Sequence, residues 1–125
     1  MIEGRVTSQR QPLITICVLG PRGTSAPTEM VVDTGFTGSL ALPGDLIARL
    51  GLPCLGLRTG FLADGREAVL NTFEALVDWH GQRRRVPALE IQRGGLVGMA
   101  LLQGSRISLD AVENGPLRIE PLPPA

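Results

Sequence analysis

Asp33 is the residue whose position most strongly indicates chemistry. The triplet Asp33-Thr34-Gly35 follows an apolar run, Met30 to Val32, and a second apolar run, Leu40 to Leu42, comes after a short turn. A carboxylate at the end of a buried strand is costly unless it is paired or used. Such a group can act as a general acid or base on a bound substrate. It can equally cap backbone amides in a tight bend, a structural role that the triplet alone leaves open.

A second apolar motif lies nearer the C-terminal end of the chain. It combines a strand end, Leu96-Val97-Gly98, with a short helix that carries the pair Leu101-Leu102. The two motifs, in this order, resemble those of the single-domain retropepsin-like aspartic proteases (clan AA, bacterial type), in which the second motif packs behind the catalytic loop. The resemblance extends from about Leu13 to Glu120 and favours catalysis over a structural turn at Asp33.

The resemblance implies a role for each residue of the two motifs. Asp33 is expected to be the catalytic carboxylate and Thr34 to hydrogen-bond across a dimer axis. Gly35 is expected to let the backbone approach the reacting water closely. Leu96-Val97-Gly98 is expected to support the active-site loop from behind.

Substrate binding is expected to involve Phe36, near the cleft, and a flap hairpin. Asp64-Gly65 is a strong signal for a tight turn, and it lies between two segments predicted to be strands. The resemblance implies that Asp64 and Gly65 form the tip of a flap, which closes over the peptide and excludes water. The charged neighbours Asp64 and Arg66 depart from the glycine-rich flap tips of the viral enzymes.

The chemistry of this family uses two carboxylates that share one proton and hold a water between them. This chain offers one Asp in a suitable motif, so a second copy is expected to supply the other, because a two-fold axis brings equivalent residues together. The resemblance therefore implies a homodimeric aspartic endopeptidase that acts on a peptide or protein substrate with water as the nucleophile. It implies neither a metal nor a cofactor, and its activity is expected to peak below neutral pH.

The elements that must position these residues are expected to be short strands, because 16 Gly and 10 Pro divide the chain into brief segments. The predicted strands are Ile2 to Thr7, Leu13 to Leu19, Glu29 to Val32, Ser39 to Leu42, Leu57 to Leu62, Glu67 to Trp79, Arg84 to Gln92, Arg106 to Leu109 and Leu117 to Glu120. Two short helices are predicted, Asp45 to Leu50 and Met99 to Leu102. We expect one all-β domain over residues 1–125, and the resemblance implies a closed acid-protease barrel.

Composition argues against several other classes of protein. The 12 basic residues balance 12 acidic residues and all of them are Arg, which argues against a broad basic surface that binds nucleic acid. No segment approaches the length of a membrane span and no N-terminal stretch suits a signal peptide, so we expect a cytoplasmic protein that binds no membrane. Cys17, Cys54 and the single His show no zinc-type spacing.

Two other functions fit parts of the same pattern. A domain of this fold could bind peptides or assemble complexes without cutting them, because fold does not fix function; such a module has no need of the intact Asp33 triplet. The segment Asp33 to Ser39 also resembles the first phosphate-binding loop of the actin-like ATPases and sugar kinases. Those folds need two lobes and further motifs, which 125 residues cannot house.

Overall fold

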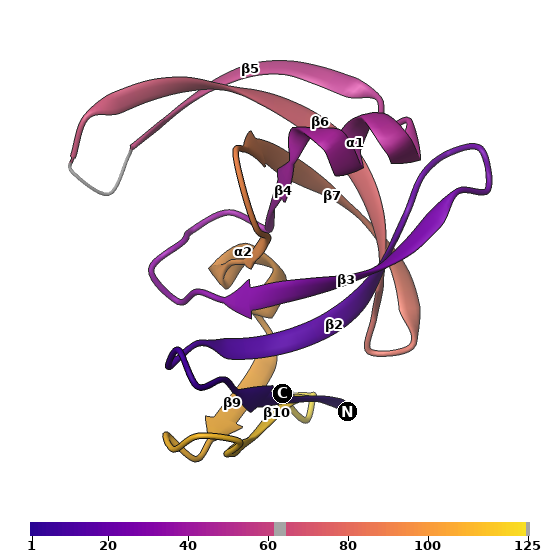
Figure 1. Cartoon of the computed structure of the whole chain (residues 1–125). Coiled ribbons are helices and arrows are strands. Elements are labelled where there is room, and N and C mark those ends of the chain that lie inside the picture. Colours follow the sequence, from indigo (N-terminus) through magenta and orange to yellow (C-terminus); the bar gives the residue numbers. More distant parts are fainter. Residues whose placement is uncertain (62–64, 125) are drawn as a thin grey trace.

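The computed structural model describes residues 1–61 and 65–124, which contain ten strands and two short helices (Figure 1). The strands are β1 (Ile2–Val6), β2 (Pro12–Leu19), β3 (Ser25–Val32), β4 (Leu40–Pro43), β5 (Cys54–Phe61), β6 (Glu67–Trp79), β7 (Gln82–Ile91), β8 (Leu96–Val97), β9 (Ser105–Leu109) and β10 (Pro116–Pro121). They are hydrogen-bonded in the order β5-β6-β7-β4-β8-β3-β2-β1-β10-β9. The prediction of an all-β chain with two short helices is confirmed.

The antiparallel pair β2 and β3 shows how the sequence builds the core. Ile14, Ile16 and Val18 are buried at alternate positions of β2, as expected for a strand with one face toward the interior. β3 runs antiparallel to β2 from Val31, opposite Leu13, to Ser25, opposite Leu19. The remaining core comes from most of the other elements and includes Met30, Leu40, Leu42, Ile47, Leu50, Val77, Val97, Leu101, Leu117 and Ile119.

The long strand β6 joins two parts of the sheet. Its N-terminal half pairs with β5 to form a hairpin, and its C-terminal half pairs with β7 from Thr72 to Trp79. Val77 also pairs with Val18 of β2. The pairings therefore lead from β6 through β7, β4, β8, β3 and β2 back to β6. In Figure 1 the β5–β6 hairpin arches over one end of the molecule.

The two helices lie next to the strands that frame the Asp33 loop. α1 (Gly44–Leu50) follows β4 and ends at Gly51, whose φ of 67° is the left-handed conformation that terminates many helices. α2 (Met99–Leu102) follows β8 and buries Leu101 and Leu102. No helix within the described residues is long and apolar enough to cross a membrane.

The two terminal strands pair with each other inside one chain. Ile2 of β1 lies opposite Ile119 of β10, and the other edge of β1 pairs with β2. β10 pairs on its second edge with β9. Figure 1 shows the two chain ends together, on the opposite side of the molecule from the hairpin. A sheet between subunits built from these two terminal strands would therefore compete with pairings inside the chain.

The predicted elements correspond closely to the observed ones, and the largest differences concern β3, β5 and β8. β3 begins at Ser25 instead of Glu29, because the apolar strand β2 supplies partners as far as Leu19. Pro27 is tolerated in β3 because β8 pairs only with Val31 and Val32 on the other edge. β5 begins at Cys54 instead of Leu57, and Leu96–Val97 forms a strand of its own.

Candidate active site

Asp33 lies on the loop between β3 and β4, and β8 fills the space between these two strands. Val32 pairs with Val97 in parallel, and Leu40 pairs with the same Val97 in antiparallel orientation. The Asp33 amide donates to the Val97 carbonyl at 2.9 Å. The two sequence motifs, which are more than 60 residues apart in the chain, are thus joined by backbone hydrogen bonds.

The start of α2 holds the far side of the same loop. The Met99 amide donates to the Phe36 carbonyl at 2.8 Å, and the Ala100 amide donates to the Gly38 carbonyl at 3.1 Å. The Gly98 amide donates to the Ser39 carbonyl at 3.0 Å. These bonds use donors at a helix N-terminus that have no partner inside the helix. The loop is therefore fixed by backbone contacts on two sides.

Gly98 is required at this junction by space. A Cβ at position 98 would lie 2.2 Å from the Gly38 carbonyl oxygen and 2.5 Å from the Phe36 ring. Because one of these neighbours is backbone, a larger residue cannot be accommodated by a side-chain rotation alone. The strand end, the loop and the Phe36 ring thus meet at a residue that must lack a side chain.

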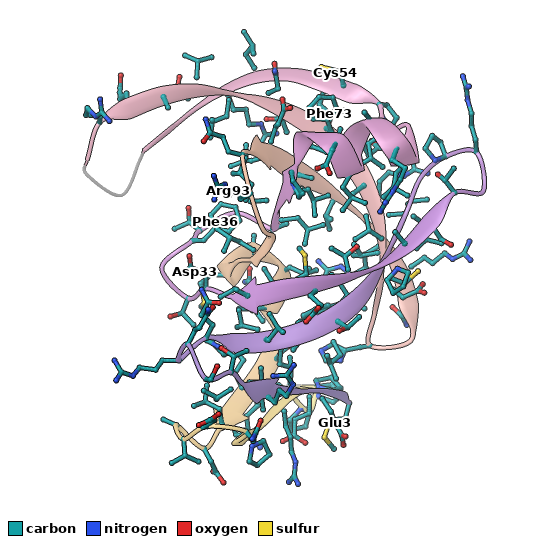
Figure 2. All side chains as sticks on the ribbon, in the orientation of Figure 1. Glu3, Asp33, Phe36, Cys54, Phe73 and Arg93 are labelled. Atoms are coloured by element: carbon teal, nitrogen blue, oxygen red, sulfur yellow. The ribbon has the colours of Figure 1, made fainter. Side chains whose placement is uncertain are left out.

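Asp33, labelled in Figure 2 near the end of β3, is partly buried. The next two residues, Thr34 and Gly35, are exposed. Oδ1 of Asp33 accepts a hydrogen bond from the Gly35 amide at 2.9 Å. The Phe36 amide donates to the Asp33 carbonyl at 3.2 Å, which closes the turn. Oδ2 has no hydrogen-bond partner among the described residues, so it can accept a proton or hold a water at this surface.

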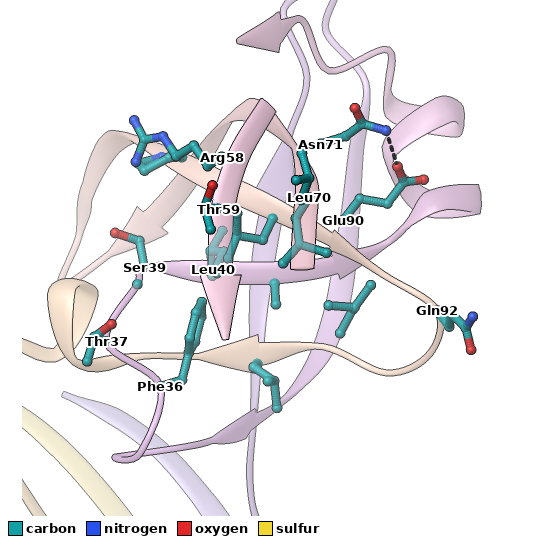
Figure 3. A pocket seen from close by; sticks show the side chains of 18 of the residues that line it. Phe36, Thr37, Ser39, Leu40, Arg58, Thr59, Leu70, Asn71, Glu90 and Gln92 are labelled. Atoms are coloured by element: carbon teal, nitrogen blue, oxygen red, sulfur yellow. Dashed lines mark hydrogen bonds between the residues drawn. The ribbon is translucent and has the colours of Figure 1, made fainter. Parts of the chain in front are cut away.

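A groove of about 1400 Å³ opens next to Gly35. Its walls are the loop after Asp33, β4, the β5–β6 hairpin and the C-terminal half of β7 (Figure 3). Figure 3 shows the Phe36 ring extending from the loop toward the hairpin. Thr59, Leu70 and Leu96 also contribute to the lining. A groove of this size, with mostly apolar walls and a few polar groups, suits an extended peptide.

The predicted site residues are distributed around this groove. Gly35, Phe36 and Leu96 line it, whereas Asp33 and Thr34 belong to the adjoining turn. Val97 and Gly98 are buried behind the loop, as expected for residues that support it.

The predicted flap corresponds to the β5–β6 hairpin. Phe61 pairs with Glu67, and Gly60 pairs with Ala68, so the strands on either side of the predicted turn are antiparallel partners. Gly65 has a φ of 86°, a conformation that favours glycine. Asp64 lies outside the described residues.

Three polar residues of the groove, Arg58, Asn71 and Glu90, were not predicted from the sequence. They come from β5, β6 and β7, and nothing in their spacing marks them as neighbours. Only the register of the strands brings Asn71 and Glu90 together. The register of β6 and β7 could have been predicted only from the turn between them and from the alternation of apolar residues along β7.

The described residues hold no group of three or more His, Cys, Asp or Glu side chains that could bind a metal ion. Both cysteines are free thiols. His80 lies away from the groove, at the β6–β7 turn, where its Nε2 is 2.8 Å from the Ser105 hydroxyl. Burial lowers the pKa of His80, and the positive charges of the N-terminal amine and Arg84 lower it further.

In comparisons with known proteins, no protein-family model and no curated protein sequence matches this chain.

Proposed function

We propose that this chain is an aspartic endopeptidase of the retropepsin type, active as a homodimer in which each copy supplies Asp33. The observation that carries the proposal is the anchoring of the Asp33 loop. Backbone bonds from Val97, Gly98 and Met99 fix that loop at one end of a groove wide enough for a peptide. A rigid carboxylate next to a substrate groove is what acid–base hydrolysis needs, because the catalytic group must be held in position before substrate binds.

The chemistry follows from the pairing of two such carboxylates. With one proton shared between them, one Asp33 accepts a proton from the attacking water while its partner donates a hydrogen bond to the scissile carbonyl. The free Oδ2 of Asp33 is the acceptor available for this water. Because the mechanism needs one proton on the pair, activity is expected to peak below neutral pH.

The fold contributes two supporting observations. The pairing of β6 with both β7 and β2 returns the strand order to its start, which we interpret as a closed barrel of the acid-protease type. The β5–β6 hairpin lies over the groove, which fits a flap that covers bound substrate.

The surface around Asp33 supports a partner of the same kind. Thr34 is exposed, and Met99, next to Gly98, is 43% exposed although it is large and apolar. A second copy placed on a two-fold axis through this surface would cover both residues and bring the two Asp33 turns together.

The cytoplasmic location of the protein stays a prediction from the sequence.

The test is cleavage of a diverse peptide pool between about pH 4 and pH 7, read by mass spectrometry, with Asp33→Asn beside the unmutated protein. The matched control is Asp110→Asn, an exposed carboxylate between β9 and β10. We expect cleavage by the unmutated protein and by Asp110→Asn, and none by Asp33→Asn. Equal cleavage by all three would refute the role of Asp33. Binding of peptides without cleavage, by a folded dimer, would favour the non-cutting peptide-binding module instead.

A further inference from the structure

Glu90 places a carboxylate in the wall of the groove. It lies near the end of β7, is partly buried, and lines the groove together with Asn71 of β6. The Asn71 side-chain amide donates to Oε1 of Glu90 at 3.2 Å, the contact drawn as a dashed line in Figure 3. This bond uses one oxygen of Glu90 and limits the rotation of its carboxylate.

Two other acids on the β6–β7 ribbon, Glu74 and Asp78, have cationic partners. Asp78 lies 3.8 Å from Arg83, and Glu74 lies 3.4 Å from Arg85. Within the described ranges, Glu90 has no cation at ion-pair distance, and its hydrogen-bond partner is the neutral amide of Asn71. Glu74 and Asp78 therefore each lie close to an arginine, whereas Glu90, in the groove, has none at ion-pair distance among the residues that the structure describes.

The second oxygen of Glu90 lies against a residue without a side chain. A Cβ on Gly44 would be 2.3 Å from Oε2, so any larger residue at position 44 would displace the carboxylate. Gly44 itself lines the groove. Oε2 has no hydrogen-bond partner in the described part of the chain and is free to accept one from a ligand.

We propose that Glu90, held by Asn71, is a specificity subsite for a basic side chain, Arg or Lys, of the peptide that occupies the groove. This substrate class rests on the proposed function. A partly buried carboxylate with one free oxygen is matched by a guanidinium or ammonium group, because charge-assisted hydrogen bonds are the stronger ones. Arg58, the one cation among the described residues that line the groove, makes no ion pair with Glu90 and leaves that carboxylate to the substrate.

The first test measures binding without any need for cleavage. The ¹⁵N-labelled protein is titrated with N-acetyl-arginine methylamide and with the neutral isostere N-acetyl-citrulline methylamide, and the Asn71 side-chain amide is followed by NMR. We expect the arginine probe to bind about three- to tenfold more tightly than the citrulline probe. Glu90→Gln should abolish this difference, and Glu113→Gln, an exposed acid outside the groove, should keep it. An equal response to both probes, or none, overturns the proposal.

The second test uses the peptide pool described above, generated so that its peptides keep internal Lys and Arg. The unmutated protein should cut sites enriched in Arg or Lys at one fixed position from the cleaved bond. Glu90→Gln should lose that enrichment, and Glu113→Gln, outside the groove, should keep both the enrichment and the cleavage. Unchanged enrichment in Glu90→Gln overturns the subsite. If the unmutated protein cuts no peptide, the proposed protease function fails, and the titration alone decides the role of Glu90.

Discussion

Gly98 is the residue on which the geometry of the Asp33 loop most depends. Its missing side chain lets the Gly38 carbonyl and the Phe36 ring approach the strand end directly. The loop is thereby packed against backbone, which gives it little freedom to shift. The proposed catalysis needs this rigidity, because small displacements of a reacting group are costly in rate.

Gly98→Ala is therefore expected to destabilise the protein by about 2 kcal/mol and to abolish activity, because overpacking against backbone costs about 1–3 kcal/mol. Urea unfolding and the peptide assay would measure the two effects. Gly60→Ala is the control, since its Cβ would meet only the flexible end of Leu70 at 3.4 Å. Equal stability of the two variants would contradict the role assigned to Gly98.

Functional residues could be predicted from the sequence where a short local motif marked them. Asp33 and Gly98 were predicted because each belongs to a short motif with apolar flanks. Glu90 was not, because its significance comes from a neighbour on another strand and from a missing side chain at Gly44. Such contacts depend on register, which local sequence specifies only weakly.

At the scale of elements, most strands and both helices could be predicted because their apolar patterns are regular and Gly or Pro mark their ends. β8 is different. Two residues, Leu96 and Val97, are too short for a periodic signal, and they form a strand only because β3 and β4 leave a gap between them. The family resemblance identified this segment where periodicity could not.

The contact between the β6–β7 turn and β9 predicts a pH effect on stability. His80 has a φ of 51° and lies 2.8 Å from the Ser105 hydroxyl. Because the folded chain lowers the pKa of His80 below 6.5, the unfolded chain binds the proton more readily. The contribution of His80 to the free energy of unfolding is therefore complete above about pH 6.5 and is lost as the pH falls below it.

His80→Asn keeps a residue that tolerates the left-handed conformation and removes the titrating ring. We expect the unmutated protein to lose more stability than His80→Asn between pH 7.5 and pH 5.5. Urea unfolding of both proteins at the two pH values gives the difference, in which the shared contributions of the carboxylates cancel. Equal losses would show that His80 does not couple to folding.

At the scale of the whole molecule, the proposed homodimer makes a quantitative prediction. If both Asp33 residues are needed, mixing the unmutated protein with an equal amount of Asp33→Asn protein should reduce the total activity to about half, because random pairing yields one fully active dimer in about four. Activity measured before and after exchange of subunits would show this. Unchanged total activity would mean that each copy works alone.

The placement of β8 also affects when the site can form. β3 and β4 lie in the first half of the chain, but the strand and helix that hold their connecting loop end at Leu102. The two terminal strands pair only after Ile119 has been made. Such long-range pairings form late and slow folding. During synthesis the Asp33 loop therefore lacks its support until Leu102 has been made. If the proposed function holds, a growing chain is not expected to cleave its neighbours on the ribosome before that point.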